Sequence, residues 1–158
     1  MVSVRAAEPQ QAELAWRESY PSSGERLVFE VDTLELTKKG WSAEITVTNS
    51  TKIPFELGQP RAGLQYGLML FATGDLGELE DAARDGRLPA PRLAERFEPT
   101  PPDVLAPGET WRATISAPGS LPDGAYVRVS FGPLQAKGEP PKDMEPKVLW
   151  ITDRSHRL

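Results

Sequence analysis

Few residues in this chain are able to form a catalytic centre. Cysteine is absent from the 158 residues, which excludes disulfides, thiolate metal sites and cysteine nucleophiles. The single histidine, His156, lies in a polar segment near the end of the given sequence. A catalytic triad needs a base held rigidly between a nucleophile and a carboxylate, which such a segment does not favour. One histidine is also too few for a histidine-based zinc or iron site.

Carboxylates gather in the one segment with helical periodicity, residues 74–87. The acidic residues there are Asp75, Glu78, Glu80, Asp81 and Asp85. A pair of carboxylates can in principle bind calcium or act as acid and base. However, the Asp-x-Asp-x-Asp-Gly spacing of a calcium loop does not occur, and neither the Gly-x-Gly-x-x-Gly nor the P-loop pattern is present. We therefore expect a solvated acidic helix face, no metal, no cofactor and no enzymatic activity.

Four tryptophans and a proline-rich stretch are the candidates for binding. Exposed tryptophans can stack on sugar rings or anchor a partner protein. Three of the four follow strand patterns, where packing in the core is the commoner fate, and the fourth, Trp16, lies in a polar region. Six of the residues from 89 to 107 are proline, and such a segment forms a stiff, extended connection. The possible partner-binding residues are Trp16, Pro99, Pro101 and Pro102.

The sequence Asn49-Ser50-Thr51 matches the acceptor pattern for N-glycosylation. A polar turn after a strand is the simpler interpretation of the same three residues. We expect the turn.

The elements that must position these residues are mainly strands. Residues 124–132 alternate apolar and polar side chains after a Leu-Pro-Asp-Gly turn, which predicts a central strand. Similar patterns predict strands in residues 26–36, 41–48, 64–71, 111–115 and 148–151. The apolar residues of 26–36 change parity at Asp32 and Thr33, which predicts a β-bulge. Lys38, Lys39 and Gly40 predict a hairpin turn.

One helix is expected in residues 74–87, within a connection between strands. Asp75 is placed to cap it, and Gly86 stands where a left-handed residue ends a helix. Residues 1–25 are rich in Ala, Glu, Gln and Ser, and we expect a tail or lead-in there. Residues 26–152 are expected to form the domain, and 153–158 a short polar tail.

Composition narrows the choice of partners. The net charge of −5 argues against nucleic acid, because phosphate contacts need a basic surface. No run of 18 apolar residues exists, so no membrane span is expected. The sequence from Met1 lacks a signal peptide, although a leader removed before Ser3 is an equally good interpretation.

Two features resemble the immunoglobulin-like β-sandwiches of bacterial envelope and accessory proteins. One is the strand that ends in Ile-Thr-Val-Thr-Asn-Ser at residues 45–50, and the other is the pair of turns at 105–110 and 121–126, each before a strand. Their order is also similar to a bacterial proteinase-inhibitor family with that fold. In the usual pattern the tyrosine after the second turn shares the parity of the inward residues. Tyr126 has the opposite parity.

The sequence therefore predicts an all-β fold, an immunoglobulin-like antiparallel β-sandwich of about seven strands with one short helix in a connection. The resemblance implies a non-catalytic protein-binding or assembly module located outside the cytoplasm or in the cell envelope. A carbohydrate or small-ligand binding domain and a proteinase inhibitor are the alternatives. The partner protein and the oligomeric state are not determined by the sequence.

Overall fold

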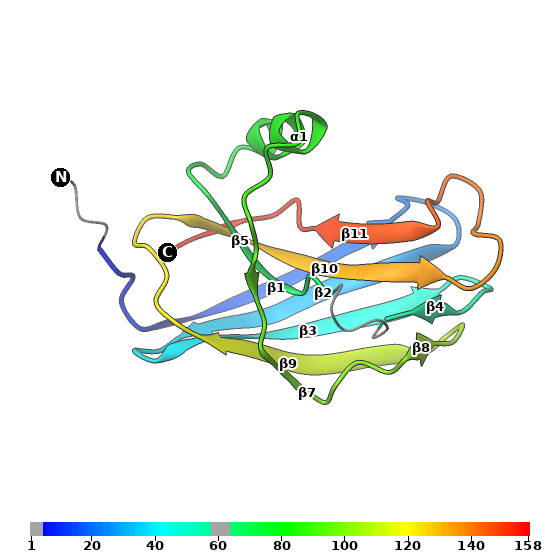
Figure 1. The fold of residues 1–158 in the computed structure, drawn as a ribbon, viewed down its shortest axis with the longest axis horizontal. Helices are drawn as coiled ribbons and strands as arrows, with labels where there is room; N and C mark the ends of the chain where they lie inside the picture. The colour runs from blue at the N-terminus through cyan, green and yellow to red at the C-terminus, as the bar shows by residue number, and fades with distance from the viewer. Residues whose placement is uncertain (1–4, 58–63) are drawn as a thin grey trace.

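The computed structural model of the chain describes residues 5–57 and 64–158, and these form two antiparallel sheets packed face to face (Figure 1). Residues 1–4 of the predicted tail, including the predicted leader junction, lie outside the described residues. The predicted all-β sandwich with one short helix is confirmed. Within the described part, none of the helices is long and apolar enough to cross a membrane.

The first sheet is built mainly from long strands. In spatial order it contains β1 (Gln10–Tyr20), β2 (Arg26–Leu36), β3 (Gly40–Ser50), β9 (Thr110–Pro118) and β7 (Arg96–Glu98). The predicted hairpin is β2 and β3, and the Thr37 hydroxyl accepts hydrogen bonds from the backbone N–H groups of Lys39 and Gly40 in its turn. The predicted bulge is also confirmed, because the register between β2 and β3 shifts between Val31 and Thr33.

The second sheet is organised around β10 (Tyr126–Ala136), the strand predicted to be central. One edge of β10 pairs with β5 (Gly67–Phe71) and β4 (Phe55–Glu56), and the other pairs with β11 (Lys147–Ile151) and β12 (His156–Arg157). Two short strands extend the sheet, β6 (Arg92–Leu93) beside β5 and β8 (Val104–Leu105) beside β4. The described residues thus hold seven strands of five residues or more and five shorter ones.

The core lies between the two sheets and follows the period of the strands. On β3, Trp41, Ala43, Ile45 and Val47 are buried while the residues between them are partly exposed. On β10, Val127, Val129 and Phe131 face the same core. Alternation of this kind is what an antiparallel sheet with one wet face requires.

The prediction of a tail over residues 1–25 is wrong for Gln10–Tyr20, which form the eleven-residue strand β1. The Ala, Glu and Gln content of this segment favours a helix by intrinsic propensity, but pairing with β2 overrides that preference. β1 bulges between Glu13 and Trp16, and Ala15 there has a φ of 51°. The prediction of a tail over residues 153–158 is also wrong in part, because His156 and Arg157 form β12.

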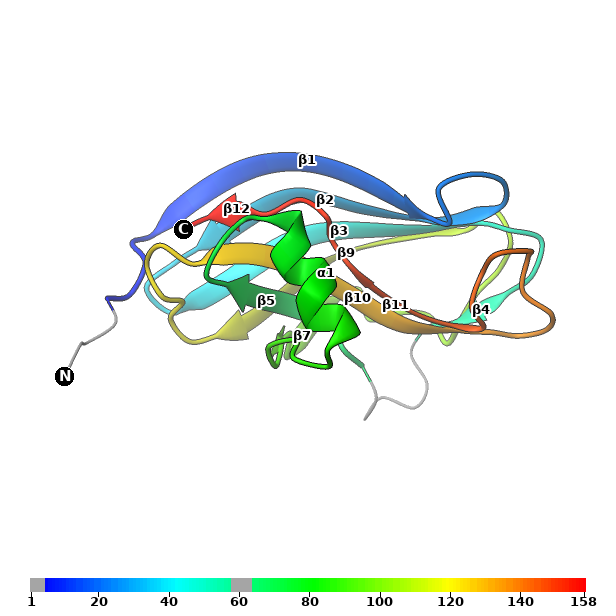
Figure 2. The ribbon, with the colours of Figure 1, turned by 90° about the horizontal axis from the view of Figure 1, so that it is seen from above.

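The helix α1 (Leu76–Arg84) lies in the connection between β5 and β6, as expected, and covers the outer face of the second sheet (Figure 2). The side chain of Asp75 caps it by accepting a hydrogen bond from Gly77 N at 2.9 Å. Gly86 has a φ of 69°, the left-handed conformation that suits glycine after a helix. Leu79 of the helix packs on Met69 and Phe71, which point outward from β5.

Tyr126 also lies on this outer face. It is half-buried and packs against the cluster formed by Leu79, Met69 and Phe71, rather than against the core between the sheets. The opposite parity seen in the sequence therefore corresponds to an outward side chain, held under the segment that leads into α1.

Asn49 forms a buried polar turn, the simpler of the two interpretations of Asn49-Ser50-Thr51. Its side chain is fully buried, and Nδ2 donates to the carbonyl oxygens of Ile53 and Leu105 at 2.8 and 2.9 Å. Oδ1 accepts from the backbone N–H and the hydroxyl of Thr51. The amide is thus used on both sides, and it joins the end of β3 to β8.

Tyr66 is the core residue whose polar group is least satisfied. The ring packs edge-on against Trp111, Phe97 and Phe131, but its hydroxyl finds no hydrogen-bond partner among the described residues. Burial raises the pKa of the Tyr66 phenol above its ordinary value. In the unfolded chain this phenol ionises near pH 10, whereas in the fold it stays protonated. The free energy of unfolding therefore decreases as the pH rises above about 10.

We expect Tyr66→Phe to raise the free energy of unfolding by about 1 kcal/mol near neutral pH, because it removes a buried hydroxyl that lacks a partner. The advantage over the wild type should grow above pH 10. Urea unfolding followed by tryptophan fluorescence at pH 7 and pH 10.5 measures both.

The matched control is Tyr20→Phe. The Tyr20 hydroxyl accepts a hydrogen bond from Glu145 N at 3.0 Å, so its removal should destabilise the protein. Equal effects of the two substitutions would contradict this account of Tyr66.

Candidate functional site

Trp16 is part of the core. It lies on β1 with 8% of its surface exposed, whereas the sequence placed it in a tail. In this structure the indole does not stand at the surface as an anchor. A role in partner binding for Trp16 stays a prediction.

The three predicted prolines lie together in the connection between β7 and β8. Pro99 is exposed and its carbonyl accepts a hydrogen bond from Trp111 Nε1 at 3.1 Å, while Pro101 and Pro102 are half-buried. Trp111 therefore fixes the proline segment to the first sheet. Partner binding by these residues also stays a prediction.

The single histidine and the possible metal ligands can be located in the described residues. His156 lies on β12 with Nε2 at 3.5 Å from Gln10 Oε1. Among residues 5–57 and 64–158, no three side chains of His, Cys, Asp or Glu lie close enough to hold a metal ion.

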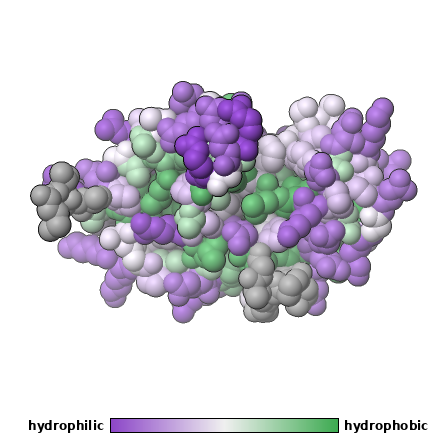
Figure 3. Space-filling view, turned by 45° about the horizontal axis from the view of Figure 1, so that its top comes forward, coloured by the Kyte–Doolittle hydropathy of each residue, from purple (hydrophilic) through white to green (hydrophobic). Residues whose placement is uncertain are grey.

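A groove lies beside α1. Its volume is about 630 Å³, and it lies between the helix and the end of β5. The apolar part of its lining is Leu70, Phe71, Ala82 and Pro89. Figure 3 shows apolar surface on both sides of the polar helix. We call this site the α1 groove.

The rim of the α1 groove is acidic. Asp75, Glu78 and Asp81 line it, although the Asp81 carboxylate is paired with the Arg84 guanidinium at 2.8 Å, and Arg87 is the one basic residue in the lining. The Arg87 guanidinium is bonded to Asp85 at 2.9 Å, so it is partly neutralised by a carboxylate outside the groove. Glu78 accepts a hydrogen bond from the Thr73 hydroxyl at 2.5 Å, which orients its carboxylate. The groove therefore combines an apolar floor with a negative rim.

The acidic helix is recognisable in the sequence, but the groove is not. The acidic residues of 74–87 were expected to be a solvated face, and those outside the groove, Glu80 and Asp85, are exposed. In the apolar lining, Leu70 and Phe71 come from β5, which ends shortly before Asp75, whereas Ala82 lies on α1 and Pro89 follows it. Only the fold of the connection over the sheet brings these apolar residues and the acidic rim together.

Arg128 supports the groove from behind. It points outward from β10 yet is completely buried, and Nη1 donates to the carbonyl oxygens of Thr152 (2.9 Å) and Asp153. Nη2 donates to Gly74 O at 3.3 Å, and Cζ lies 5.4 Å from the centre of the Phe71 ring. Burial lowers the pKa of Arg128, and the negative charges of Asp153 and Glu18 oppose that shift. Arg128 thus ties the groove floor and the start of α1 to residues 152–153.

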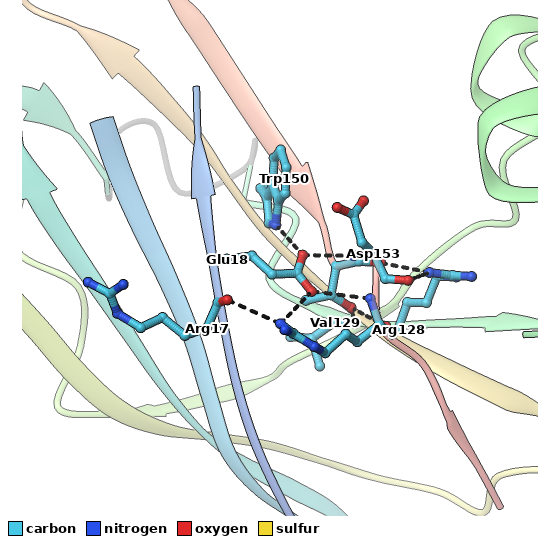
Figure 4. A network of polar contacts seen from close by, with 8 residues as sticks. Arg17, Glu18, Arg128, Val129, Trp150 and Asp153 are labelled. Atoms are coloured by element: carbon cyan, nitrogen blue, oxygen red, sulfur yellow. Dashed lines mark hydrogen bonds and ion pairs between the residues drawn. The ribbon is translucent and has the colours of Figure 1, made fainter. Parts of the chain in front are cut away.

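Glu18 fixes the same segment from the first sheet (Figure 4). Its side chain is 7% exposed, and Oε1 accepts hydrogen bonds from Trp150 Nε1 at 3.0 Å and Asp153 N at 2.7 Å. Oε2 accepts from Arg154 N at 3.1 Å and lies 3.7 Å from the Arg154 guanidinium. We call these contacts the Glu18 clasp.

No protein-family model, no curated protein and no solved structure matches this chain. The groove and its supports are therefore the basis for a functional proposal.

We expect Glu18→Gln to lower the free energy of unfolding by about 2 kcal/mol, because the amide turns one acceptor into a donor that faces N–H groups. Glu13→Gln, at an exposed position of the same strand, is the control and should change stability by no more than about 0.5 kcal/mol. Urea unfolding measures both variants. Similar stabilities for the two would contradict the clasp.

Proposed function

We propose that the chain is a non-catalytic protein-binding or assembly module with an immunoglobulin-like β-sandwich, and that the α1 groove is its binding surface. The observation that carries the proposal is the groove itself, a concave site of about 630 Å³ that has apolar residues at its floor and carboxylates at its rim. Apolar concave surfaces with a few placed polar groups are the usual form of binding sites.

The strand order supports the immunoglobulin-like part of the proposal. In immunoglobulin domains one sheet has the order A-B-E-D and the other contains C, F and G. The orders β2-β3-β9-β7 and β6-β5-β10, with β11 beside β10, correspond to these, with β6 in the place of an added C′ strand. β1 is then an extra strand outside A. The outward Tyr126 departs from the usual corner, so the likeness is to the general architecture.

The location in a bacterial cell envelope is part of the same proposal. It rests only on the resemblance of the strand at 45–50 and the turns at 105–110 and 121–126 to bacterial envelope and accessory proteins.

The two alternatives have less support. Carbohydrate binding by stacking needs at least two exposed tryptophans on one face. Trp16, Trp41 and Trp111 are each less than 10% exposed, and Trp150 stacks on Phe29 with ring centres 5.6 Å apart. Proteinase inhibition rests on the resemblance alone, and an assay against serine and cysteine proteinases tests it directly.

The proposal is tested by reversing charge at the groove. We expect the immobilised chain to capture specific proteins from the cells that produce it, and the double variant Glu78→Lys/Asp81→Lys to lose them. The reason is that both carboxylates line the groove, while neither belongs to the core. Mass spectrometry of the captured proteins, with circular dichroism to verify the fold, is the measurement.

The control is Glu13→Lys/Glu35→Lys, which makes the same change in net charge at exposed positions of the first sheet. It should capture the same proteins as the wild type. Capture that is unaffected by the groove variant, or turnover of a hydrolase or transferase substrate that one carboxylate substitution abolishes, would overturn the proposal.

A further inference from the structure

We propose that the α1 groove takes an extended segment of its partner in which basic and apolar side chains alternate, and that this segment adds to the sheet as a strand beside β5. The inference rests on the proposed function and specifies the occupant of the same groove. It follows from the free edge of β5, the alternation of that strand and the charge of the rim.

The edge of β5 that faces away from β10 is only partly covered by another strand of the described residues. On one side β5 pairs with β10 along its whole length, from Gly67 to Phe71. On the other side β6 pairs only with Gly67 and Leu68. No further strand of the described residues covers this side of β5 beyond Leu68, which is where Leu70 and Phe71 line the groove.

The second step is the direction of the backbone groups. Tyr66 O accepts a hydrogen bond from Ala94 N at 2.8 Å, so the backbone groups of Tyr66 point to the β6 side. Because these directions alternate along a strand, those of Leu68 and Leu70 point the same way. Leu70 therefore directs its N–H and C=O to the edge that β6 leaves open. An exposed edge of this kind pairs readily with an extended peptide.

The third step is the alternation of side chains. Leu68 and Leu70 belong to the core side of the sheet, whereas Met69 and Phe71 point to the outer side, under α1. Successive side chains of an added strand would alternate in the same way. The side chains on one face of the added strand would extend the apolar inner face beside Leu70. Those on the other face would lie next to the acidic rim of the helix.

The fourth step is charge. Asp75, Glu78 and Asp81 face the groove, and the two nearby arginines, Arg84 and Arg87, are each paired with a carboxylate, so the three acidic residues outweigh the positive charge at the rim. Lysine or arginine at the outer positions of the added strand complements this rim, and their aliphatic stems can pack on the apolar floor. A second copy of this chain is disfavoured as the occupant, because pairing β5 with β5 would bring two acidic rims together.

The probe is an eight-residue peptide of alternating valine and lysine, blocked at both ends and labelled with fluorescein. We expect the full chain to bind it, and Glu78→Lys/Asp81→Lys to weaken binding about tenfold or more, as measured by fluorescence polarisation. Glu13→Lys/Glu35→Lys should bind as the wild type does. A peptide of valine and glutamate should not bind. Equal binding by the two double variants, or by the two peptides, would overturn the inference.

A second measurement tests strand addition separately from charge. In an antiparallel pair, the peptide residue that exchanges backbone hydrogen bonds with Leu70 has its side chain on the same face of the sheet as Leu70, the inner face. In the proposed arrangement the valines occupy this face. Methylation of the backbone nitrogens of the valines should therefore abolish binding. Methylation of the backbone nitrogens of the lysines should be tolerated. Equal sensitivity at both sets, or equally tight binding of a single blocked lysine, would overturn strand addition and indicate a simple cation site.

The inference and the proposed function fail in different ways. If the peptides do not bind while protein capture still depends on Glu78 and Asp81, the occupant is wrong and the binding surface is right. If capture is also independent of these residues, the proposed function is wrong.

Discussion

The burial of the Arg128 guanidinium is the constraint on which the outer half of the second sheet depends. A buried positive charge is costly unless its N–H groups find acceptors. Here the acceptors are mainly backbone carbonyls, those of Thr152, Asp153 and Gly74, rather than a carboxylate. Backbone carbonyl groups can accept these hydrogen bonds only if the chain bends around the guanidinium. The charge therefore fixes two separate segments, the one that leads into α1 and the one that follows β11.

The Glu18 clasp holds one of these segments from the opposite sheet. β1 and β11 are edge strands of different sheets, and an open sandwich leaves a gap between such edges. Glu18 bridges the gap by accepting backbone N–H groups of the segment whose carbonyl groups bind Arg128. The peptide units of 152–154 thus lie between a carboxylate that accepts their N–H groups and a guanidinium whose Nη1 donates to their carbonyl oxygens. The Arg128 Nε has no hydrogen-bond partner among the described residues. The groove is positioned by contacts that reach from β1 to α1.

The strands of the core were predictable because each carries its own signal. β3 and β10 show strict alternation, and the bulge in β2 is visible as a change of parity at Asp32 and Thr33. β1 was not predicted, because its Ala, Glu and Gln content indicates a helix or tail and its alternation is short and interrupted by the bulge at Ala15. Trp16 was misplaced for the same reason. Pairing with β2 determines both the strand conformation of β1 and the burial of Trp16, and the local sequence pattern does not reveal that pairing.

The groove itself arises from where the helix is inserted. After Phe71 the chain leaves the sheet, forms α1 and returns to the edge of β5 only at Arg92, next to a proline. Among the described residues, this detour leaves the end of β5 without a strand on the edge opposite β10, a feature that promotes association in any sheet protein. The carboxylates of α1 stand beside that open edge. In a chain of net charge −5 they repel another copy of the same edge and attract a basic one. Under the proposed strand addition, protection against self-association and selection of a partner are two effects of one arrangement of charge.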